Sequence, residues 1–166
     1  MVDGFVADQL IDGTRFRALT IADVYTREAL DIVGQRLRAE HVVETCSRLL
    51  AQHGCPVRIF VDNGSRFSGR LFDLWAHDRK ATIDFSRPSK PTDNYLVETL
   101  NGSLRDECLS VHWFETIDEA RATIDAWRVE YNESRPHQAL NDQTPAEFAG
   151  QARHLVTSEE FSNADI

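Results

Sequence analysis

The feature that most constrains this fold is a change in the spacing of apolar residues after the first 35 positions. Before it, apolar and polar residues mostly alternate, and an Asp-Gly pair marks a turn at 11–14. From Ala39 onward, apolar residues recur at helical spacing, interrupted by two short apolar runs. Three strands joined by short turns predict an antiparallel meander. The five expected strands are 4–10, 15–23, 29–34, 57–61 and 82–85.

Helical segments separate the later strands, which predicts an α/β fold with a five-stranded mixed sheet and helices on both faces. A helix beginning after Ser68 is expected to turn Leu71, Leu74 and Trp75 inward. A short last helix should open at Pro145. The other expected helices are 39–53, 94–109 and 117–133. Residues 1–150 are therefore expected to form one domain, and 151–166 a polar, disordered tail.

Charge and cysteine content narrow the classes of function. The net charge of −9 argues against a protein that coats nucleic acid without specificity. The charge is uneven, however: residues 57–105 carry 8 basic and 6 acidic side chains, whereas 106–166 carry 4 and 13. Any contact with a polyanion is therefore expected in the middle of the chain. Cys46, Cys55 and Cys108 lack metal-ligand spacing and are expected to be buried thiols in a reducing cytoplasm. No segment has the apolar length of a membrane helix.

The histidines and tryptophans have simple structural explanations. His112 and His137 do not form a metal cluster by spacing, and His137 is expected to be a hydrogen-bonded residue in the loop after the long helix. Trp75, Trp113 and Trp127 are expected to be core or partly buried aromatics.

Two carboxylates are candidates for chemistry. Asp62 directly follows an apolar strand, and ligands of open α/β sheets bind at the carboxyl ends of strands. Taken alone, Asp62 is more simply the first residue of an Asp-Asn-Gly turn. Glu98 shares a helical face with Asn94, Asn101 and Arg105, because steps of three and four residues return to one side of a helix. Such a polar stripe is most often only solvated.

The spacing and flanks of these two carboxylates nevertheless resemble the catalytic core of insertion-sequence transposases of the IS3 family and of retroviral integrases. That core carries two aspartates and one glutamate. The resemblance covers residues 1–150, because the motifs recur in order along the chain. They are VDNG at 61–64, DFSRPSKPTDN at 84–94, VETLNGSLRDECL at 97–109, HWF at 112–114, YNESRPHQAL at 131–140 and TPAEF at 144–148.

The resemblance implies a ribonuclease-H-like fold in which three carboxylates hold Mg²⁺ or Mn²⁺ for cutting and joining DNA. Asp62 and Glu98 match two of the three ligands. The resemblance also implies transposon ends and target DNA as partners, and a homodimer is plausible. The residues that it implies for DNA contact are Arg87, Lys90, Asn94 and Arg105.

The first ligand departs from the family pattern. Aligning Phe5, Val6, Asp8, Gln9 and Leu10 with that pattern puts Gly4, not Asp3, at the position of the first aspartate. A shift of one residue turns a side chain to the other face of a strand, so Asp3 could serve as a catalytic ligand only if the chain start bulges or frays enough to turn it inward.

Three functions are therefore open. The first is a transposase core, impaired because Gly4 stands at the first aspartate position. The second is a non-catalytic remnant that acts as a weak nucleic-acid-binding or protein-interaction module. The third is a self-sufficient nuclease of the ribonuclease H type.

Overall fold

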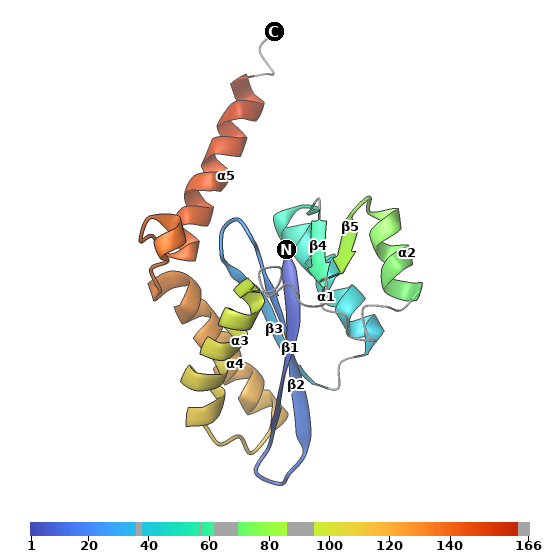
Figure 1. The fold of residues 1–166 in the computed structure, drawn as a ribbon, viewed down its shortest axis with the longest axis vertical. Helices are drawn as coiled ribbons and strands as arrows, with labels where there is room; N and C mark the ends of the chain where they lie inside the picture. The colour runs from blue at the N-terminus through green and yellow to red at the C-terminus, as the bar shows by residue number, and fades with distance from the viewer. Residues whose placement is uncertain (36–37, 57, 62–69, 86–94, 163–166) are drawn as a thin grey trace.

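A five-stranded sheet lies at the centre of the structure, a computed structural model that describes residues 1–35, 38–56, 58–61, 70–85 and 95–162. β1 pairs antiparallel with β2, and β2 with β3, whereas β4 is parallel to β1 and β5 to β4. The strand order is β3-β2-β1-β4-β5 (Figure 1). The predicted meander and the two further strands are therefore confirmed. The strands are β1 (Val2–Gln9), β2 (Arg15–Ala22), β3 (Ala29–Gln35), β4 (Arg58–Val61) and β5 (Thr82–Phe85).

A tight turn sets the register of the β1–β2 hairpin. Gly13 has a φ of 81°, which glycine adopts without the steric cost of a side chain. The backbone N–H of Thr14 donates to Asp12 Oδ1 at 2.8 Å, and that of Leu10 donates to the Thr14 carbonyl at 2.9 Å. The pairing then runs without a register shift along all of β1.

Helices cover both faces of the sheet, as predicted (Figure 1). Neighbouring residues of a strand face opposite sides, so β2 contributes to two cores. Leu19 and Ile21 pack with α1 and α2, whereas Ala18 packs with α3 and α4. The four helices are α1 (Ala39–His53), α2 (Arg70–Asp78), α3 (Tyr95–Glu107) and α4 (Ile117–Ser134).

The inner face of α2 differs from the predicted one. Phe72, Trp75 and Ala76 are buried, and the rings of Phe72 and Trp75 stack with centroids 5.4 Å apart. Leu71 and Leu74 are 44% and 56% exposed, so their predicted inward position was wrong. Residues three or four positions apart lie on the same side of a helix, so Phe72 shares one face with Trp75 and Ala76, whereas Leu71 and Leu74 share another. The structure turns the face with Phe72 toward the core.

Trp113 and Cys55 also differ from their predicted burial. Trp113 is 84% exposed, because the next residue, Phe114, takes the buried position and packs its edge on Phe16. Cys55 is exposed, whereas Cys46 and Cys108 are buried as predicted. Burial, together with the nearby charge of Asp8, raises the pKa of the Cys108 thiol to about 11.

The last helix is longer than predicted. After the short 3₁₀ helices η2 (Leu109–Val111) and η3 (Gln138–Leu140), α5 runs over Pro145–Ser162 and extends away from the sheet (Figure 1). Thr144 and Glu147 form a capping box: Glu147 N–H donates to Thr144 Oγ1 at 3.2 Å, and Thr144 N–H donates to Glu147 Oε2 at 2.9 Å. The cap and the helix-forming residues after it carry α5 into the segment predicted as a tail, whose disorder stays a prediction. Within the described ranges, no helix combines the length and the apolarity needed to cross a membrane.

Candidate functional site

Gly4 occupies the point where β1 meets α3. It is buried and lies opposite Thr20 of β2. A Cβ added at Gly4 would stand 3.0 Å from Asn101 Nδ2 and 3.1 Å from Val97 Cγ2, both on α3. The position of β1 that faces the helix carrying Glu98 is therefore Gly4.

The start of β1 adjoins the end of β4. Val2 is paired with Phe60, and the Phe60 N–H donates to the Met1 carbonyl at 2.9 Å. β4 ends at Val61, and Asp62, which follows it in the sequence, lies outside the described residues. The backbone of Asp3 pairs in regular register with Ile21, while its side chain is not described.

α3 presents Glu98 and Arg105 to solvent. Glu98 lies in its first turn and Arg105 in its last, and both are exposed, as expected for a polar helical face. Asn101, which shares that face by sequence, instead reaches the sheet: the Thr20 hydroxyl donates to Asn101 Oδ1 at 2.6 Å. Thr20 is the residue that could have indicated this contact from the sequence, because it is a polar residue in the apolar stretch ALTIA. Thr20 is fully buried.

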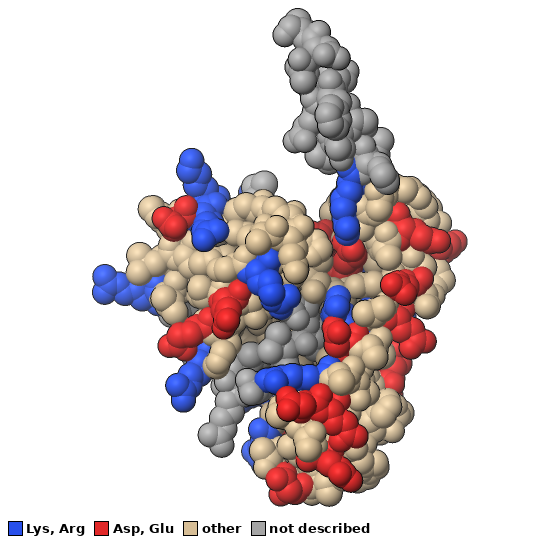
Figure 2. All heavy atoms as spheres, turned by 180° about the vertical axis from the view of Figure 1, so that it is seen from behind, with Lys and Arg blue, Asp and Glu red and all other residues tan. Residues whose placement is uncertain are grey.

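The predicted DNA-contact residues are only partly within the described ranges. Arg87, Lys90 and Asn94 lie outside them, and Arg105 is exposed on α3. Figure 2 shows Asp and Glu side chains gathered over the lobe that holds α4, while Lys and Arg are more frequent over the lobe that holds α1 and α2. The acidic surface therefore follows the acidic last third of the sequence.

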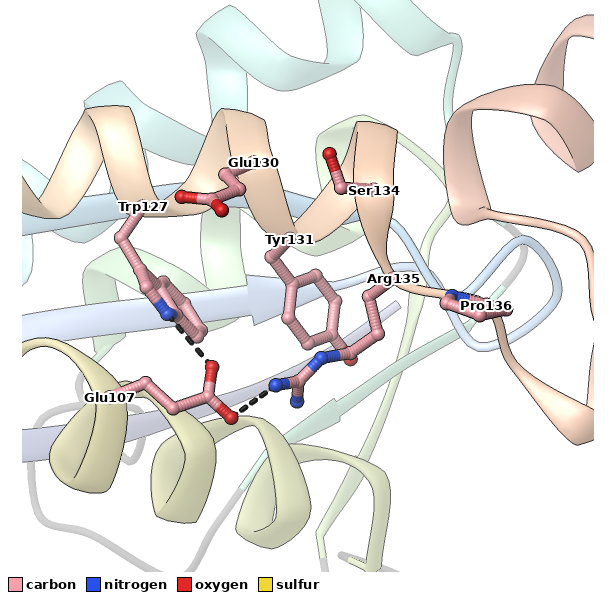
Figure 3. A pocket seen from close by; sticks show the side chains of 7 residues that line it. All are labelled: Glu107, Trp127, Glu130, Tyr131, Ser134, Arg135 and Pro136. Atoms are coloured by element: carbon pink, nitrogen blue, oxygen red, sulfur yellow. Dashed lines mark hydrogen bonds and ion pairs between the residues drawn. The ribbon is translucent and has the colours of Figure 1, made fainter.

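A charged network joins the end of α3 to the end of α4 (Figure 3). Arg135 forms an ion pair with Glu107, donates to Ser103 Oγ at 2.7 Å and lies 5.1 Å from the centroid of the Tyr131 ring. Trp127 Nε1 donates to Glu107 Oε2 at 3.1 Å. Glu107, Trp127, Tyr131 and Arg135 line a cavity of about 400 Å³. Sequence reasoning missed this network, because its partners lie in two separate motifs.

His137 packs against this network. Its ring lies edge-on to Tyr131 with centroids 5.4 Å apart. Its backbone N–H donates to the Gln143 carbonyl at 3.0 Å, but its buried Nε2 has no hydrogen-bond partner within the described residues. The predicted hydrogen bond is therefore made by the backbone of His137 and not by Nε2. Burial and the positive charges of Arg135 and Arg27 lower the pKa of His137.

The described side chains do not complete a metal site. No three His, Cys, Asp or Glu residues in the described ranges lie together in a way that could hold an ion. Of the predicted ligands, Glu98 is described and Asp62 is not, and Gly4 supplies no ligand atom. The described part of the site thus offers one carboxylate facing solvent and a closed contact where β1 meets α3.

Comparison with known proteins finds similarity to integrase cores in both sequence and fold. Residues 79–145, which include β5, α3 and α4, match the integrase core domain family. The chain is 42% identical over 156 residues to the insertion element IS407 uncharacterized 31.7 kDa protein of Burkholderia multivorans, covering 93% of this chain and 56% of that protein. It is 27% identical over 146 residues to the transposase for insertion sequence element IS904 of Lactococcus lactis, covering 82% of this chain and 55% of that protein.

The fold agrees with these sequence matches. The HTLV-2 integrase catalytic core domain in complex with magnesium superposes with a TM-score of 0.67 at 13% identity, covering 89% of this chain and 93% of that one. The structure is thus an integrase-core fold of the ribonuclease H type, as predicted. The chain spans about half the length of the curated relatives it matches.

Proposed function

We propose that this chain, whose sequence is similar to the integrase core domain family and to insertion-element proteins, is the catalytic core of a transposase, which cuts and joins DNA phosphodiesters. The observation that carries the proposal is the position of Glu98. It is exposed on the first turn of α3, and α3 packs on β1 where the start of β1 adjoins the end of β4. In α/β sheets, functional groups gather at the carboxyl ends of strands.

Mg²⁺ or Mn²⁺ is the cofactor of this proposal, with Glu98 and Asp62 as its ligands. Carboxylate oxygens suit these hard cations, and a bound ion would supply charge stabilisation to the oxygens of an in-line displacement. Gly4 contributes no ligand, and the regular pairing of β1 does not provide the bulge that a role for Asp3 requires. We therefore propose that catalysis is impaired.

The proposed DNA contacts are to the phosphate backbone. Arg105 is exposed on the same helix as Glu98, and Arg87, Lys90 and Asn94 belong to the neighbouring motif. Phosphate contacts position DNA without reading its sequence and weaken as salt rises. Transposon ends and target DNA are the proposed partners, a homodimer the proposed assembly and the cytoplasm the proposed location.

A non-catalytic remnant of the same fold is the second candidate, and Gly4 is the observation that favours it. A Cβ at this position would meet the side chains of Asn101 and Val97 at close range. A chain with this contact keeps the fold of a transposase core but holds an ion weakly. Its remaining activity would be weak binding of nucleic acid or of another protein.

A DNA assay separates these functions. The purified chain is incubated with Mn²⁺ and labelled duplex DNA, and its Glu98→Gln variant serves as the control. Joining of DNA ends that Glu98→Gln abolishes supports the transposase. Metal-dependent hydrolysis without joining supports a nuclease. The absence of both products supports the remnant. Activity that Glu98→Gln leaves unchanged would contradict the role of Glu98 in every case.

A further inference from the structure

Gly4 is an unusual residue for a buried position of β1, the central strand of the sheet. Glycine there loses more backbone entropy than other residues and offers no side chain to pack. Such a glycine commonly marks a place where another segment comes close. The close segment here is α3: the Asn101 and Val97 side chains would stand 3.0 and 3.1 Å from a Cβ at position 4, and Thr20 Oγ1 3.5 Å from it.

Asn101 is held in this position from the sheet. Thr20 is fully buried, so its hydroxyl needs a partner inside the protein, and Asn101 Oδ1 provides it at 2.6 Å. The amide Nδ2 of Asn101 is thereby directed at Gly4. The hydrogen bond fixes the end of a side chain that would otherwise rotate freely.

The helix itself cannot easily retreat from β1. Val97 and Leu100 flank Asn101 on α3 and are 3% and 1% exposed, and both belong to one core cluster with Ala22 and Ala29. Moving α3 outward would open this close-packed layer, and cavities in such layers cost stability. The space next to Gly4 is therefore occupied by the Asn101 amide, and the packing of α3 on the sheet keeps it closed.

We propose that Asn101 is a positioning residue that fills the place of a carboxylate at position 4, with Thr20 holding it there. The part of this proposal that concerns metal rests on the proposed function above. Glu98 lies about one helical turn before Asn101. The contact of Asn101 with Gly4 and Thr20 therefore also helps to fix the distance of Glu98 from the sheet.

This arrangement predicts how the site responds to repair. Gly4→Asp alone introduces a carboxylate into a space that Asn101 already fills. The new side chain must displace the Asn101 amide or α3, and a shift of α3 would also move Glu98. Gly4→Asp combined with Asn101→Ala removes the amide from this space and leaves Val97 Cγ2, 3.1 Å from the Cβ position, as the remaining close contact on α3.

Two measurements test the proposal separately. In the first, urea unfolding compares the chain with Gly4→Ala, Asn101→Ala and the double variant, and Gly102→Ala is the matched control because its Cβ would meet nothing within 4 Å. We expect Gly4→Ala to lower the unfolding midpoint clearly, and to lower it much less when Asn101 is already alanine. Equal losses in both backgrounds would overturn the proposal and leave the proposed function untouched.

In the second, Mn²⁺ binding is titrated by electron paramagnetic resonance for the chain, Asn101→Ala, Gly4→Asp, and Gly4→Asp with Asn101→Ala. We expect the double variant to bind about tenfold more tightly than Gly4→Asp, a difference of about 1.4 kcal/mol. Equal binding by both Asp variants would overturn the proposal. Weaker binding by Asn101→Ala than by the unchanged chain would also overturn it, because Asn101 would then be a ligand. Coupling in urea without Mn²⁺ binding by any variant would support the filling role of Asn101 and contradict the proposed metal site.

Discussion

The two ends of α3 are held by different chemistry. Near Glu98, the helix rests on β1 and β2 through buried side chains and one hydrogen bond between Thr20 and Asn101. Near its other end, Glu107 is joined to Arg135 by an ion pair, with side chains 42% and 35% exposed. The buried contact has no room for change, whereas water screens the charged one. The difference indicates that the position of Glu98 depends mainly on packing and little on charge.

The largest expected effect comes from removing packing at the buried end. Leu100→Ala deletes a side chain that is 1% exposed on α3. It should lower the free energy of unfolding by about 2–5 kcal/mol, measured by urea denaturation, because it removes apolar burial and leaves a cavity. Leu74→Ala on α2 is the matched control, since this leucine is 56% exposed and should cost far less. Similar losses for both variants would contradict the assigned burial.

A smaller loss is expected from removing the hydrogen bond at the same end. Thr20→Val keeps the shape of the side chain but leaves Asn101 without its donor. The free energy of unfolding should fall by about 1–3 kcal/mol, because a buried polar group loses its partner. Thr99→Val is the comparison, as Thr99 is exposed on α3 and its hydroxyl donates to the Tyr95 carbonyl of the same helix. If Thr20→Val is neutral, the hydrogen bond does not hold α3.

The charged end should contribute less and respond to salt. A double-mutant cycle of Arg135→Met and Glu107→Gln should give a coupling energy of about 0.2–1 kcal/mol, because both side chains are more than a third exposed. The coupling should shrink in about 1 M NaCl, where screening is strong. A coupling that is larger than the cost of Thr20→Val would reverse the ranking of the two ends of α3.

The smallest expected effect is a pH dependence at His137. Its pKa in the folded protein is lowered by burial and by Arg135 and Arg27, so folding favours the neutral ring. The unfolded chain takes up the proton near the ordinary pKa of about 6.5, so this contribution is full above that pH and is lost as pH falls toward the lowered pKa. His137→Gln should flatten the loss of stability between about pH 7 and pH 5. An unchanged slope would show that His137 does not titrate with folding.

Local patterns predicted most of the fold. The alternation of the first segments gave β1 to β3, and helical spacing gave α1, α3 and α4 within a few residues. Local patterns predicted burial less reliably where two different sets of apolar residues on one helix both have helical spacing. On α2 they favoured Leu71 and Leu74 over Phe72, because both sets have helical spacing and only the neighbouring layer decides between them.

The candidate site was predictable only in part. The polar face with Glu98 and Arg105 follows from helical spacing, and both residues are exposed. The inward turn of Asn101 does not follow, since Thr20 lies 81 positions away in the sequence. Likewise, the Arg135–Glu107 pair joins two helices whose sequences carry no sign of each other.

By itself, the sequence determined the order of strands and helices, the exposed carboxylate on α3 and the prediction that Gly4 stands at the position of the first aspartate. These are properties of short segments, whose hydrophobic period and turn residues act locally. Only the tertiary structure decided what fills the space at Gly4, because that depends on how closely α3 packs on β1. Packing distances come from the whole core, and at this contact a Cβ on residue 4 would stand only 3.0 Å from the amide of Asn101 and 3.1 Å from Val97.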